Sequence, residues 1–126
     1  MNNKLSAVIV GRPATKKNSG RIVKFGNRMA LLPSKAFEVY QDIALWQLKK
    51  YKERFDGNVH VQCKYYLPNN AHWPDLVGLL QATSDILEKS GILENDRLIV
   101  SYDGSRIMGI DKENPRAEIF IEKWGE

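Results

Sequence analysis

The chain has 126 residues, of which 43% are hydrophobic and 27% charged, values that fit one ordinary globular domain and not a disordered chain. Cys63 is the only cysteine, which excludes an intrachain disulfide and a thiolate zinc cluster. No apolar run reaches the length of a membrane span or a signal-peptide core, so we expect a soluble, cytoplasmic protein that has no membrane partner.

Charge is distributed unevenly along the chain, although the formal net charge is only +4. Residues 1–37 contain eight Lys or Arg and no Asp or Glu, whereas the rest of the chain contains eleven basic and fifteen acidic residues. This asymmetry indicates a polyanionic partner for the front of the molecule, and a solvated basic face is the alternative.

The N-terminal part of the chain predicts a strand, a loop and a hairpin. Lys4 to Val10 is a β-branched apolar run of the kind that forms strands, and residues 11–20, rich in turn formers and cations, predict a loop. Residues 21–25 and 28–32 predict the two strands of a hairpin, because Gly26-Asn27 between them suits a two-residue turn.

Two helices are expected after the hairpin. The first spans about residues 35–53, where apolar residues recur at helical spacing, and the second about residues 75–90, before the stop signal Gly91. Further strands are predicted at residues 59–67, 98–102, 106–108 and 117–123. This order favours a single α+β domain, residues 1–126, with a mixed β-sheet and two main helices packed on it.

The best candidate for chemistry is a set of carboxylates around the second predicted helix. Asp75 stands at its start, and Glu94 and Asp96 follow its end. The helix covers about 24 Å, so Asp75 and Asp96 meet only if neighbouring strands bring both helix ends to one rim. Phosphodiester hydrolysis benefits from a divalent metal, and magnesium prefers oxygen ligands. The alternatives are a helix cap for Asp75 and an exposed turn for Glu94 and Asp96.

The second candidate site is the loop and hairpin from Gly11 to Arg28, which contains six basic residues and no acidic one. Its cations can bind phosphates and release counterions. Trp73, like Trp46 and Trp124, offers a ring for base stacking, although such aromatics pack more often in the core. The DNA-binding residues predicted from these patterns are Arg12, Lys16, Lys17, Asn18, Arg21 and Trp73.

Several motifs occur in an order that is found in one known family. The first strand is followed by Gly-Arg-Pro-x-x-Lys-Lys-Asn-Ser from Gly11 to Ser19. Pro74-Asp75-Leu76, then Ala82 to Leu87, then Ser90 to Asp96 follow without gaps in their spacing. In both respects the chain resembles the RusA-type Holliday junction resolvases, and the resemblance covers nearly its whole length.

The resemblance implies a homodimeric, Mg²⁺-dependent endonuclease that cuts paired strands of a four-way DNA junction without an organic cofactor. By position, Asp75 matches the first catalytic carboxylate of the family and Asp96 the late one, so both are expected to bind Mg²⁺. The family's second carboxylate falls on Val77, and a functionally important lysine falls on Gln81. Asp103, which ends the strand that starts just after Asp96, is the expected replacement for the missing catalytic carboxylate.

Two further interpretations remain open. Val77 and Gln81 are compatible with a protein that binds DNA junctions but has no nuclease activity. A third interpretation is an RNA-binding protein, which also needs a basic front segment.

Overall fold

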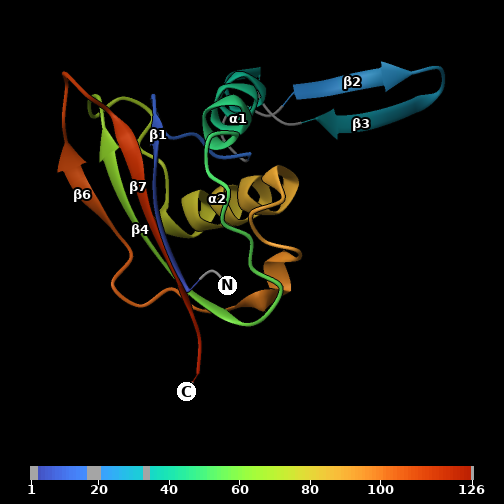
Figure 1. The fold of residues 1–126 in the computed structure, drawn as a ribbon. Helices are drawn as coiled ribbons and strands as arrows, with labels where there is room; N and C mark the ends of the chain where they lie inside the picture. Colours follow the sequence, from blue (N-terminus) through green and yellow to red (C-terminus); the bar gives the residue numbers. More distant parts are fainter. Residues whose placement is uncertain (1–2, 17–20, 33–34, 126) are drawn as a thin grey trace.

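A five-stranded mixed sheet carries two helices on one face, and a separate two-stranded hairpin extends beyond them (Figure 1). The computed structural model describes residues 3–16, 21–32 and 35–125. Within these residues, no helix is both long and apolar enough to cross a bilayer.

The strands of the main sheet follow the order β1-β7-β4, and β5 and β6 share the far edge of β4. β7 is antiparallel to β1 and to β4, whereas β4 is parallel to β5, beside its start, and to β6, beside its end. Both pairing modes occur in one sheet, so the predicted α+β fold with a mixed sheet is confirmed. The bounds are β1 Lys4–Val10, β4 Val59–Leu67, β5 Ile99–Ser101, β6 Arg106–Ile110 and β7 Arg116–Lys123.

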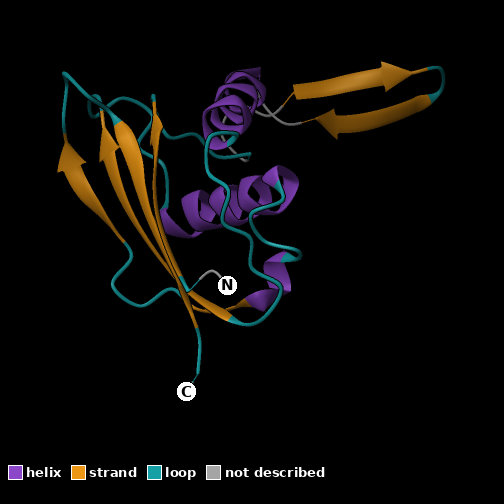
Figure 2. Cartoon of the chain, in the orientation of Figure 1, coloured by secondary structure: helices purple, strands orange, loops and turns teal. Residues whose placement is uncertain are grey.

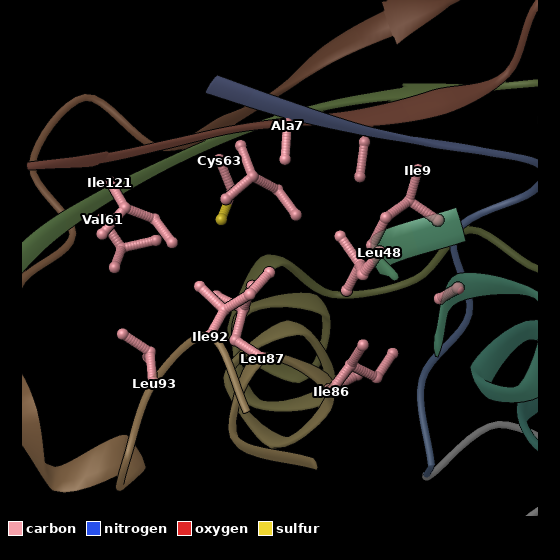
Figure 3. Packing of buried hydrophobic residues seen from close by; sticks show 14 of the residues in the cluster. Ala7, Ile9, Leu48, Val61, Cys63, Ile86, Leu87, Ile92, Leu93 and Ile121 are labelled. Carbon is pink, nitrogen blue, oxygen red and sulfur yellow. The ribbon is translucent and has the colours of Figure 1, made fainter. Parts of the chain in front are cut away.

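Both helices, α1 (Lys35–Leu48) and α2 (Leu76–Ser90), cover the same face of the sheet (Figure 2). Burial alternates along β4 and β7, so every second side chain faces the helices and the others face outward. Figure 3 shows this core, which includes Ala7, Ile9, Val61, Cys63 and Ile121 from the sheet, Leu48 from α1, and Ile86 and Leu87 from α2.

Helix α2 connects the loop after β4 to the segment that returns to the start of β4, and it crosses the strands of the sheet, as its nearly end-on view in Figure 3 shows. It follows the loop that leaves β4 after Leu67, and it ends at Gly91, whose φ of 85° suits a glycine C-cap. Leu93 then forms a parallel bridge with Phe55, just before β4, and Ile99 pairs with Val59. After α2 the chain therefore returns to the start of β4.

Helix α1 ends at Leu48, whereas the sequence pattern predicted an end near residue 53. Beyond Leu48 the chain turns so that the Tyr51 hydroxyl accepts a hydrogen bond from the Val8 N–H at 3.2 Å. Phe55 then donates its N–H to Ile92. Tertiary contacts therefore override the helical periodicity of residues 49–53.

The free edge of β1 is covered by side chains from α1 and the segment after it. The Gln47 amide accepts from the Val10 N–H at 2.8 Å and donates to the Val10 carbonyl at 2.9 Å. Gln47 thus occupies the hydrogen-bonding position of a neighbouring strand. Because open strand edges invite pairing with another chain, this contact protects β1.

The predicted hairpin is confirmed as β2 (Arg21–Phe25) and β3 (Arg28–Leu32). Its strands pair with each other and not with the main sheet, and Figure 1 shows it projecting beyond α1. A two-stranded hairpin is marginally stable by itself.

Candidate nucleic-acid and metal site

Asp75 caps the N-terminus of α2 and remains solvent-exposed. Its backbone is extended, and its Oδ2 accepts a hydrogen bond from the Gly78 N–H at 3.0 Å. A Cβ on residue 78 would lie 2.7 Å from Asp75 Oδ1 and 3.2 Å from Thr15 Cγ2. Glycine at position 78 therefore allows the carboxylate and the N-terminal loop to approach the helix closely. The capping interpretation of Asp75 is correct, and it leaves the second carboxylate oxygen able to face a cation.

The described part of the basic loop, residues 11–16, is fastened beside this helix start. The Arg12 guanidinium donates to the carbonyl of Ala71, in the loop that precedes α2. Lys16 forms an ion pair with Asp85, further along α2. The loop is thus bonded both to α2 and to the segment before it, with Arg12 beside the residues that lead into Asp75 and Lys16 further along the helix.

The structure describes only some of the remaining predicted DNA-binding residues. Lys17 and Asn18 lie outside the described residues, and Arg21 is described only as the first backbone residue of β2. Trp73, two residues before Asp75, is 48% exposed. Trp46 and Trp124 are also exposed, so none of the three tryptophans serves the core. Exposed aromatic rings are available for stacking on bases.

Asp96 lies at the other end of α2, at the start of a short 3₁₀ helix, Asp96–Leu98. Its N–H donates to Glu88 Oε1 at 2.8 Å, so it sits against the last turns of α2. Burial raises the pKa of Tyr102, and the nearby Asp96 carboxylate acts in the same direction.

Asp103 lies in the exposed turn between β5 and β6, at the edge of the sheet beside β4. Its N–H donates to Ser101 Oγ at 3.2 Å. The neighbouring Gly104 has a φ of 82°, and a Cβ there would meet the Gln62 amide at 2.2 Å. Asp103 is therefore fixed by β4 and its edge strands and not by α2.

The three aspartates do not converge within one protomer. At the helical rise, Asp75 and Glu88 are separated by about 20 Å along the axis of α2, and Asp96 is bonded to Glu88. The part of the chain that the structure describes contains no group of three or more His, Cys, Asp or Glu arranged to hold a metal. A metal site that uses both Asp75 and Asp96 is thus incomplete in a single chain.

Val77 and Gln81, one helical turn apart on α2, are exposed, and Val77 is 68% exposed. Ser84, one turn further on the same side, is buried, and Glu88 beyond it is exposed again. The two family positions that carry unexpected residues, 77 and 81, are therefore both exposed. Sequence reasoning treated these positions only as departures, although their helical spacing places them on one face.

Cys63 contributes to packing and not to chemistry. The side chain is fully buried under the helices, and burial raises the pKa of its thiol to about 12. A thiol with such a pKa is not a nucleophile near neutral pH.

Together these features define a small, basic α+β domain with exposed carboxylates at both ends of one helix. The family model for the endodeoxyribonuclease RusA matches residues 11–122. The protein therefore belongs to the RusA endodeoxyribonuclease family, whose members resolve DNA junctions, and the resemblance in its motifs is confirmed. No curated protein sequence matches the chain.

The cap at Asp75 can be separated from any chemistry by two substitutions. Asp75→Ala should lower the free energy of unfolding by about 1 kcal/mol, because the Gly78 N–H loses its partner. Asp75→Asn should leave it nearly unchanged, because an asparagine oxygen caps equally well. Urea denaturation measures both, with Asp42→Ala on the exposed side of α1 as the control. Equal stabilities of the Ala and Asn variants would contradict the cap.

Proposed function

We propose that the protein is a Mg²⁺-dependent endonuclease that cuts four-way or other branched DNA junctions as a homodimer. The observation that carries the proposal is the position of Asp75. By its motif this carboxylate matches the first catalytic residue of the family to which the chain belongs, and it is exposed at the start of α2, close to the basic loop. The whole chain, residues 1–126, would act as one nuclease domain in the cytoplasm.

Mg²⁺ is the metal that fits these donors best. Asp75 and Asp96 offer carboxylate oxygens on the surface, and magnesium keeps several waters, so it needs few protein ligands. When bound, Mg²⁺ supplies an activated water and offsets the charge that develops on the phosphate. The chain's own contribution is to hold Asp75 in place through the Gly78 N–H and Asp96 through Glu88.

A two-fold dimer would complete the site that a single chain leaves open. If two α2 helices pack antiparallel, Asp75 of one protomer approaches Asp96 of the partner subunit. A two-fold axis repeats this arrangement, so two equivalent sites form at the two ends of the helix pair. Two matched sites suit a junction in which two strands are cut. Asp103, at the sheet edge, is the weaker candidate for a third catalytic carboxylate.

DNA contacts are assigned to the basic front of the molecule. Arg12, beside the α2 start, and Lys16, held by Asp85, would bind phosphates, together with Lys17, Asn18 and Arg21. Trp73 would stack on a base close to Asp75. Such phosphate binding weakens steeply as salt rises.

A second candidate function is junction binding without nuclease activity. The observation that favours it is Val77, because an exposed apolar side chain on α2 stands where the resemblance expects a carboxylate. This candidate predicts salt-sensitive junction binding and no cleavage with either Mg²⁺ or Mn²⁺.

Removing either proposed ligand should abolish cleavage but leave binding. Asp75→Asn and Asp96→Asn should each reduce Mg²⁺-dependent cleavage of a four-way junction to background, because each removes a charged oxygen ligand. Junction affinity in EDTA should change by less than about threefold, because neither residue is assigned to phosphates. Asp42→Asn, an exposed substitution on α1, is the matched control. Undiminished cleavage by Asp75→Asn would refute the assignment.

A second test of the proposal adds a carboxylate at the position where the resemblance expects one. Val77→Asp should raise Mg²⁺-dependent cleavage by roughly tenfold or more, because it adds an oxygen ligand next to Asp75. The side chain is exposed in the single chain, so the free energy of unfolding of one subunit should change by less than about 0.5 kcal/mol. Val100→Asp, at an exposed position on β5, should have no such effect on cleavage. Cleavage absent in wild type and still absent in Val77→Asp would favour the binding-only function.

A further inference from the structure

A groove of about 610 Å³ lies between the loop that follows β1 and the first turns of α1. Its apolar wall includes Val10, Val39 and Ile43, each about half exposed. Val39 and Ile43 are one helical turn apart, so α1 presents both to the same side. Apolar side chains from two elements that remain exposed around one hollow are unusual and mark a binding surface.

Two cations, Arg12 and Lys35, line this groove together with His72. None of the described residues that line it is acidic. Arg12 and His72 also belong to the segments that flank the start of α2: Arg12 is bonded to Ala71, and His72 precedes Asp75 by three residues. The groove therefore lies next to the proposed cleavage site without including its carboxylates.

His72 is held in an uncommon backbone conformation beside this groove, with a φ of 50°. It is the one non-glycine residue with a positive φ in the described part of the chain. Such conformations persist where the surrounding structure holds them, and they occur often at binding sites. Here the carbonyl of the preceding residue, Ala71, accepts from Arg12, so the conformation of His72 is coupled to the position of the cation.

We propose that the groove receives one unstacked nucleotide of the branched DNA, with its base against Val39 and Ile43 and its phosphate near Arg12 and Lys35. This inference rests on the proposed function, because it takes branched DNA as the ligand. An unstacked nucleotide presents the two surfaces that the groove complements, an apolar base face and an anionic phosphate. The volume lies within the range of sites that hold a small ligand. Paired duplex DNA offers no free base face, so the groove favours a branch point.

The inference is tested by affinity alone, measured in EDTA by fluorescence anisotropy so that no strand is cut. The probes are three four-way junctions: fully paired, with one unpaired adenine at the branch, and with an abasic nucleotide in place of that adenine. Wild-type protein should bind the adenine junction about tenfold more tightly than the other two, because the extra base is seated in the groove.

Two variants examine the groove, each with a matched control elsewhere on the surface. Val39→Trp fills it and should remove the tenfold preference, whereas Val100→Trp on β5 should keep it. Ile43→Glu places a negative charge in it and should also remove the preference, whereas Met108→Glu on β6 should keep it. All four positions are exposed, so the variants are expected to fold. If one groove variant does not fold, the other, which carries a chemically different change, still tests the groove.

Three results would overturn the inference. The first is equal affinity of wild type for the adenine and abasic junctions. The second is an undiminished preference in both groove variants. The third is a change in the solution mass of Val39→Trp with the preference intact, which would assign the groove to a second copy of the chain. Wild-type protein that does not cleave with Mg²⁺ but still prefers the adenine junction would instead refute the nuclease function. The inference about the groove would then remain valid.

Discussion

The packing of α2 against the sheet is the constraint on which the site depends. Ile86 and Leu87 are completely buried against the sheet, and the C-cap at Gly91 returns the chain to the start of β4. The helix therefore acts as a rigid spacer of about 22 Å for its fifteen residues. Asp75 is fixed at one end by its cap and Asp96 at the other by Glu88. Any shared function of these carboxylates must bridge that length.

The N-terminal third of the chain serves two structural purposes at once. β1 is an edge strand that Gln47 covers, and the loop after it leaves the sheet to bond to the segment before α2. Arg12 consequently lies beside the segment that leads into Asp75, and Lys16 lies further along α2, at Asp85. These cations can attract phosphates to α2 and to the segment before it.

Much of the fold could be predicted from local patterns. The hairpin followed from Gly26-Asn27, and the start of α2 followed from Asp75, because turn and cap preferences depend on neighbouring residues only. The end of α1 could not be predicted, because it depends on the contact of Tyr51 with β1. The separation of Asp75 and Asp96 also required the structure, since sequence spacing alone does not show which strand ends share a rim. The groove beside α1 had no sequence signal, because Val39 and Ile43 look like ordinary core positions.

The central claim is that one cleavage site needs Asp75 and Asp96 from two different chains. Mixing the inactive Asp75→Asn and Asp96→Asn proteins, after brief unfolding and refolding together, tests it most directly. Each mixed dimer would regain one intact site, so nicking of a four-way junction should return to about a quarter of the wild-type rate. If each site instead lies within a single chain, the mixture stays as inactive as its components, and that result would contradict the account.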